Sequence, residues 1–199
     1  MARKKGRHRR GDLRRGTRSR SPRPRFLIVC EGEKTEPYYF DDLRGRIPGK
    51  VKGLGESPVR VVKHTIKLMK ENDYEQVWCV FDRDVFPEEN FNKALRLAEK
   101  HGIKVAYSNQ AFELWYVLHF KYHDAPTHRH LYIERLTKLM REPYEKNLRD
   151  MYERLEDQQE MAIRNAERLL KTYDPPNPAR DNPSTTVHLL VQELNRFAV

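Results

Sequence analysis

The nine residues from Gln76 to Asp84, QVWCVFDRD, constrain the fold more than any other stretch of this chain. Five consecutive apolar residues precede Asp82, and such a run, rich in β-branched and aromatic residues, is typical of a strand buried on both faces. Alternate residues of an extended chain point to the same side, so Asp82 and Asp84 can direct their carboxylates to one point. Ligands of parallel sheets bind at the carboxyl ends of the strands, which is where this pair would lie.

The acidic pair itself has two explanations. Mg²⁺ usually takes one or two carboxylates and keeps several waters, so Asp82 and Asp84 at a fixed strand end suit this ion. An acidic pair after a strand can also be only a turn, and for an isolated pair the turn is the more frequent explanation. The rest of the chain has to decide between them.

Apolar strands alternate with amphipathic helices along the first two thirds of the chain. This alternation predicts βαβ units and therefore an α/β fold, with about four mostly parallel strands flanked by helices. Strands are expected at residues 26–30, 51–54, 77–81 and 104–108, and helices at 38–43 (with Pro37 at its first position), from Ser57 onward, and at 88–101.

The segment 109–120 is apolar nearly all round except for Glu113, which predicts a helix buried on most sides. A carboxylate in that setting is costly unless it is paired or binds a cation. Alternatively, Glu113 lies in the first turn of the helix and interacts with the helix dipole. The sequence leaves both explanations open.

The C-terminal third is predicted to be helical. Residues 127–173 are amphiphilic and highly charged, Pro143 marks a break, and 150–173 has the pattern of one long helix. A last helix follows the capping segment 182–185. Its inward residues are expected to be Val187, Leu190, Val191 and Leu194. We therefore divide the chain into an arm (1–25), a core (26–125) and a helical region packed on the core (126–199).

The net charge of +10 belongs to the first 25 residues, which carry 12 Lys or Arg residues and one Asp. The remainder has a net charge of −1. Because residues 1–25 contain few apolar groups, we expect a disordered arm. It is either a solubilising tail or, as we favour from its charge density, an arm that binds nucleic-acid phosphates. The residues expected to do so are Arg3, Lys4, Lys5, Arg7, Arg9, Arg10, Arg14 and Arg15.

Several classes of protein are disfavoured. No run of 18 apolar residues and no secretory signal is present, and both cysteines lie in predicted strands, so we expect a reduced cytoplasmic protein. The chain has no phosphate-binding GxxxxGK[ST] motif, so any ATP would have to be bound by a partner. Four histidines at 119, 123, 128 and 130 lack the spacing of a zinc site and are interpreted as surface residues.

Acidic residues follow two of the predicted strands. Glu31 comes directly after residues 26–30, so Glu31 and the pair Asp82 and Asp84 should lie along one edge of the sheet. Phosphodiester chemistry needs a metal to screen the phosphate and a separate group to act as acid or base. Lys34 could stabilise phosphate charge. Glu33 and Glu36 could complete the shell of a second ion, although each alone is more simply explained as a loop or helix-start charge.

Four segments resemble, in this order, the RloB family of the wider Toprim group: LIVCEGEKTEPYYF, VWCVFDRD, NQAFELWYVLHF and NPSTTVHLL. The resemblance extends from about residue 26 to the C-terminus. It implies a Toprim core in which three acids coordinate Mg²⁺, with Mn²⁺ as an alternative, and a fourth acid lies in the active site. Carried over, the ligands are Glu31, Asp82 and Asp84, and the fourth acid is Glu113. One departure is that the family helix usually begins with Asn-Pro, whereas this chain has Asn109-Gln110.

The residues and the resemblance together predict a Mg²⁺-dependent nuclease. Its catalytic residues would be Glu31, Lys34 and Glu113, and its substrate DNA or RNA, for example tRNA. The resemblance also implies a role in phage resistance or abortive infection, with an AAA- or ABC-type ATPase encoded nearby. The alternative is a nucleic-acid-binding or effector subunit whose Toprim site is silent. Oligomeric state is left open.

Overall fold

The computed structural model describes residues 23–84 and 87–197 of the chain, and within them four strands form one parallel sheet. The strands are β1 (Phe26–Cys30), β2 (Gly49–Gly53), β3 (Gln76–Arg83) and β4 (Lys104–Asn109), in the spatial order β2-β1-β3-β4. The prediction of an α/β fold with a parallel sheet is confirmed, and the arrangement is consistent with a Toprim-like fold. The eight arm residues predicted to bind nucleic acid lie outside the described residues.

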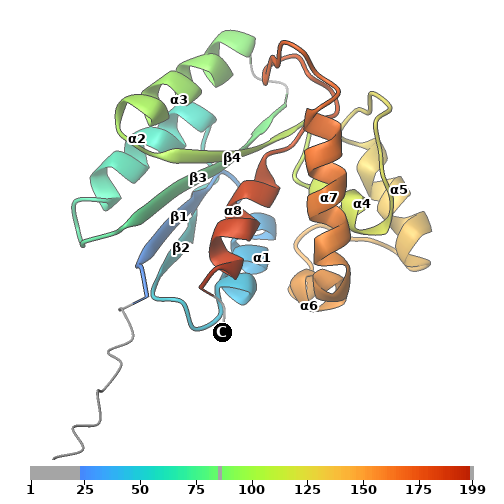
Figure 1. Ribbon diagram of the computed structural model, residues 1–199, viewed down its shortest axis with the longest axis horizontal. Helices are drawn as coiled ribbons and strands as arrows, with labels where there is room; N and C mark the ends of the chain where they lie inside the picture. Colours follow the sequence, from blue (N-terminus) through green and yellow to red (C-terminus); the bar gives the residue numbers. More distant parts are fainter. Residues whose placement is uncertain (1–22, 85–86, 198–199) are drawn as a thin grey trace, which may run out of the picture.

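Helices cover both faces of the sheet. The helices α2 (Pro58–Leu68) and α3 (Glu88–Lys100) lie on one face, and α1 (Thr35–Arg44) and α8 (Val187–Asn195) on the other (Figure 1). Because strand side chains alternate, Leu27 and Val29 pack toward α2 and α3, whereas Phe26 and Ile28 pack toward α1 and α8. No helix in the described ranges is both long and apolar enough to cross a membrane.

The order of the strands creates a switch point between β1 and β3. The chain leaves β1 through α1 toward β2 on one side, and leaves β3 through α3 toward β4 on the other side. The two connecting helices lie on opposite faces, so a crevice opens outside the carboxyl ends of β1 and β3. Cys30 is paired with Val80, which brings Glu31 and Asp82 together at this crevice.

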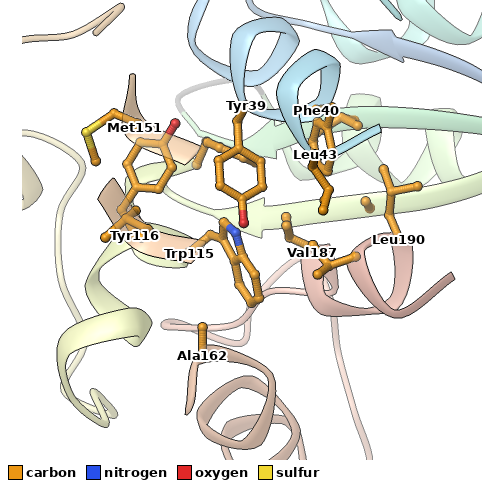
Figure 2. Close-up of a cluster of buried hydrophobic side chains, with 14 of the residues drawn as sticks. Tyr39, Phe40, Leu43, Trp115, Tyr116, Met151, Ala162, Val187 and Leu190 are labelled. Atoms are coloured by element: carbon orange, nitrogen blue, oxygen red, sulfur yellow. The ribbon is translucent and has the colours of Figure 1, made fainter. Parts of the chain in front are cut away.

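The C-terminal region packs against the same hydrophobic core as the sheet. Besides α8, its helices are α5 (Leu131–Met140), α6 (Met151–Leu155) and α7 (Gln159–Leu170), and they follow α4 (Glu113–Phe120), the last helix of the core. Figure 2 shows Trp115 and Tyr116 of α4 facing Tyr39 of α1, with Ala162 of α7 and Val187 of α8 closing the cluster. All four residues predicted to face inward on α8 are fully buried.

The segment NPSTT covers the outer edge of β4. Thr185 forms an antiparallel bridge with Ser108, and the Thr186 hydroxyl accepts a hydrogen bond from the backbone N–H of Tyr107 at 2.9 Å. The backbone N–H of Asn109 donates to the carbonyl of Ser184 at 2.7 Å. These bonds satisfy an edge strand that would otherwise be open to pairing with another chain.

Two predicted boundaries were wrong at the starts of helices. The helix α1 begins at Thr35, so Pro37 lies inside its first turn rather than at its first position. The missing N–H of Pro37 still costs nothing there, because backbone N–H groups of the first turn have no partner within the helix. Residue 109 extends β4 instead of starting a helix, and α4 begins only at Glu113. Gln110 between them has a φ of 72°, a conformation that a proline could not adopt.

The predicted single helix over 150–173 was also wrong. A 3₁₀ turn at Glu156–Gln158 separates α6 from α7, and α7 ends at Leu170. The break allows α6 to pack on α1 while α7 packs on α4, which one straight helix could not do.

Adjacent leucines of α8 provide a test of this packing. Leu190 is fully buried whereas Leu189 is 44% exposed. We predict that Leu190→Ala lowers the free energy of unfolding by about 2–5 kcal/mol, because it leaves a cavity between α8 and the sheet. Leu189→Ala should change it by less than about 1 kcal/mol. Urea denaturation of both variants measures the difference, and equal losses would contradict the described orientation of α8.

Candidate active site

A pocket of about 350 Å³ lies outside the carboxyl ends of β1 and β3. Acidic and basic side chains both line it, and every site residue predicted in the folded part of the chain is among them. The acids are Glu31, Glu33, Glu36, Asp82, Asp84 and Glu113, and the bases are Lys34, Arg129 and Lys146.

Backbone hydrogen bonds fix two of these acids. The Oε2 atom of Glu31 accepts the backbone N–H of Asp82 at 3.0 Å, and Oδ2 of Asp82 accepts the backbone N–H of Phe112 at 3.2 Å. The backbone N–H of Glu31 in turn donates to the carbonyl of Val80 at 2.8 Å, continuing the ladder between β1 and β3. The ends of two strands and the start of α4 therefore hold both carboxylates at the crevice.

Burial strongly perturbs the acids at the centre of the pocket. It raises the pKa of Glu31 to about 8, the hydrogen bond from Asp82 opposes this shift, and the charges of Asp84 and Glu36 add to it. Burial also raises the pKa of Asp82 well above its usual range, with further contributions from Glu36 and Glu31. Grouped carboxylates of this kind are destabilised as anions, and a bound cation would relieve that destabilisation.

Glu36 belongs to this group, although the sequence favoured treating it as an ordinary helix-start charge. It is only 5% exposed, and its Oε1 atom accepts the backbone N–H of Gly32 at 3.3 Å. A Cβ atom on Gly32 would lie 2.1 Å from Oε2 of Glu36, so a larger residue there would displace the end of the Glu36 side chain. Burial raises the pKa of Glu36, and the nearby Glu113 raises it further.

Two glycines, one at the end of β2 and one just after it, allow the loop that follows β1 to lie close to the sheet. A Cβ atom on Gly53 would lie 2.4 Å from the carbonyl oxygen of Gly32. Gly55 has a φ of +64°, and a Cβ there would lie 2.7 Å from Oε1 of Glu33. The loop after β1 therefore passes directly over the end of β2, with Glu33 at the rim of the pocket.

Cations from the C-terminal region are paired with two of the acids. The guanidinium of Arg129 lies 2.5 Å from Oδ2 of Asp84. The ammonium of Lys146 lies 3.4 Å from Oε1 of Glu113, which also accepts a hydrogen bond from the Tyr144 hydroxyl at 3.3 Å. Glu113 satisfies both explanations left open by the sequence, because it lies in the first turn of α4 and its charge is paired.

The donor set fits a hard divalent cation by its chemistry and location. Glu31, Asp82 and Asp84 supply carboxylate oxygens at one edge, and burial raises the pKa values of Glu31 and Asp82. Nevertheless, across residues 23–84 and 87–197 no three His, Cys, Asp or Glu side chains stand as a group that could hold an ion. A cation bound by Asp84 would compete with the guanidinium of Arg129 for its carboxylate.

Sequence reasoning missed Arg129 and Lys146, together with the pocket-lining residue Asn147. They lie in irregular segments between helices, where no periodic pattern marks a residue as inward.

The interpretation of the four histidines as surface residues was partly wrong, since His119 is fully buried and His123 is 4% exposed. His119 contacts the carbonyl of Trp115 and His123 the hydroxyl of Thr127, so both have structural partners.

The raised pKa of Glu31 predicts a pH-dependent stability in the absence of divalent cations. Its folded-state pKa is about 8 against a usual value of 4.5, so the native protein holds this proton more tightly than the unfolded chain. The resulting stabilisation is complete below about pH 4.5 and is lost as the pH rises through 8. We expect the free energy of unfolding in EDTA to fall across this range.

The comparison that isolates this effect uses Glu31→Gln. Its unfolding free energy, measured by urea denaturation at several pH values, should fall by up to about 1.4 kcal/mol less per pH unit than that of the wild type. Glu160→Gln removes a carboxylate whose side chain is 90% exposed and should keep the wild-type dependence. Identical pH dependence in Glu31→Gln and the wild type would show that Glu31 titrates normally.

Comparison with known proteins agrees with this geometry. A family model described as RloB-like protein matches residues 26–194, from the first residue of β1 to the last turn of α8. No curated protein and no solved structure gave a significant match. The match covers most of the chain and includes every element that lines the pocket, and the chain therefore belongs to the RloB family.

Proposed function

We propose that this protein is a Mg²⁺-dependent endonuclease that hydrolyses phosphodiester bonds of DNA or RNA. The observation that carries the proposal is the pocket at the switch point, where Glu31 and Asp82 lie half-buried beside Asp84. Three bases line the same pocket, so it can bind both a cation and the phosphate of a nucleic acid. A site built only to neutralise its own acids would not need to be an open pocket.

The acids and bases of the pocket would have three roles: to bind the cation, to bind the phosphate and to transfer a proton. Glu31, Asp82 and Asp84 would hold Mg²⁺, or Mn²⁺ in its place, which when bound screens the phosphate charge and activates the attacking water. Lys34 and Lys146 can contact the phosphate oxygens, because both side chains reach the pocket and both are partly exposed.

Proton transfer is assigned to two carboxyl groups of the pocket, those of Glu31 and Glu113. Glu31 has a pKa of about 8 before a cation binds, so near neutral pH it can hold a proton and release it as the cation binds. Glu113 faces the same pocket with Tyr144 and Lys146 on one carboxylate oxygen. It is positioned to take part in proton transfer to the departing oxygen.

The biological setting is a further part of the proposal. Resemblance within the RloB family suggests a role in phage defence through abortive infection, with tRNA among the candidate substrates. The sequence has no GxxxxGK[ST] motif, so an ATP-dependent step would need an ATPase supplied by a separate chain.

The decisive experiment is cleavage of DNA and of total tRNA by the purified full chain with Mg²⁺ or Mn²⁺. We expect metal-dependent cleavage, and at least a 100-fold or so loss of rate in Glu31→Gln and in Asp82→Asn. Glu160→Gln, which also removes one carboxylate, should cleave at the wild-type rate because its side chain is 90% exposed on α7. Cleavage that survives in both pocket variants would exclude this pocket as the active site.

A second candidate function is a nucleic-acid-binding or effector subunit with a silent site. The pairing of Asp84 with Arg129, and the absence of a ready three-ligand group among the described residues, favour it. Deletion of residues 1–25 separates the two candidates. A binder that acts through its arm should lose nearly all affinity and salt dependence, whereas a nuclease should keep metal-dependent cleavage at lower efficiency. If the full chain binds nucleic acid without cleaving it, the assay is repeated in the presence of an ATPase encoded near this chain.

A further inference from the structure

A second pocket, of about 240 Å³, lies between the first turns of α2 and α3. Two residues one turn apart on each helix face it: Arg60 and Lys63 from α2, and Asn90 and Lys93 from α3. We call these four residues, with Ser57, Pro58 and Val59, the basic pocket. The first turn of α2 contains no acidic residue that would neutralise its bases.

The three bases of the basic pocket have no partners within the described parts of the chain. Neither Arg60, Lys63 nor Lys93 forms an ion pair or a side-chain hydrogen bond, although Glu89 precedes Lys93 by one helical turn. Other exposed bases do pair, as Arg154 does with Asp150 and Arg180 with Glu88. Three like charges around one pocket repel each other, and a bound anion would relieve the repulsion.

The basic pocket lies on the same edge of the sheet as the carboxylates. Gly55 packs against Glu33, which lines the active-site pocket, and Ser57 follows only two residues later. Two residues span at most about 8 Å between Cα atoms. The start of the basic pocket therefore lies close to the loop that carries Glu33 at the rim of the active-site pocket.

We propose that the basic pocket binds the phosphodiester backbone of the nucleic acid on its way into the active-site pocket. This inference rests on the proposed nuclease function and assigns it a substrate-binding subsite in the folded part of the chain. DNA and RNA share the phosphate chemistry that Arg60, Lys63 and Lys93 recognise. Contacts to phosphates fix position without reading sequence, so the subsite orients a strand rather than selecting its bases.

Binding is measured separately from cleavage. The full-length Glu31→Gln variant in EDTA is mixed with labelled single-stranded DNA or RNA of one sequence, and fluorescence anisotropy gives Kd over a range of salt concentrations. We expect the added substitutions Arg60→Gln, Lys63→Gln and Lys93→Gln to weaken binding by about tenfold or more. The slope of log Kd against log salt should fall by about 2, because each phosphate contact on a single strand contributes about 0.7.

A matched control removes three bases at, or just beyond, the opposite ends of the same helices. Lys67, Lys70 and Lys100 are exposed and form no ion pair among the described residues. Their replacement by Gln changes the net charge equally, but it should leave Kd and the salt slope within about twofold of those of Glu31→Gln. Thermal melting of both triple variants checks that neither substitution set unfolds the chain.

The outcomes distinguish this inference from the proposed function. Equal Kd and slope in the basic-pocket variant and its parent, or an equal loss in the control, would overturn the subsite even if the wild type cleaves nucleic acid. A selective loss for the basic-pocket variant supports the subsite even if no cleavage is found. A loss for RNA alone, or for DNA alone, would identify which nucleic acid the subsite accepts.

Discussion

The parallel pairing of β1 with β3 is the interaction on which the candidate site depends. It places Cys30 opposite Val80, and the next residues along each strand then meet through the bond from the Asp82 backbone to Glu31. A slip of one residue would turn Glu31 to the other face and exchange the apolar residues of β1 between the two cores, which would both have to repack. Burial of both faces of β1 therefore fixes the position of the first acid as firmly as any contact within the pocket.

Grouping buried acids at this position works against stability, and the C-terminal region offsets part of the cost. Arg129 and Lys146 neutralise Asp84 and Glu113, and Tyr144 donates a further hydrogen bond. All three residues follow α4 in the chain, so the helical region contributes to the site itself and not only to the hydrophobic core. The pocket still has more acids than bases, and this remaining negative charge makes it suitable for a cation.

The parts of the structure that could be predicted are those that leave a local pattern in the sequence. Apolar runs marked β1 and β3, and their positions alone placed Glu31 and Asp82 at one edge. The start of α4 was predicted four residues too early, at Asn109 instead of Glu113, because Ala111 and Phe112 are as apolar as the helix that follows them. Arg129 was missed, and Glu36 was considered only as a possible ligand of a second ion, for another reason: a charged residue in a loop or first turn looks the same whether it faces solvent or a pocket.

Net charge illustrates the same limit on a larger scale. Outside residues 1–25 the chain is nearly neutral, which by itself suggests no attraction to a polyanion. The folded chain separates its charges, with acids gathered inside one pocket and bases at its rim and in the basic pocket. A phosphate backbone approaching the carboxylates alone would be repelled, so bases near the entrance are a physical requirement for a site of this kind. Arg60, Lys63 and Lys93 lie at the starts of α2 and α3, on the same edge of the sheet as the acids, where such bases are needed.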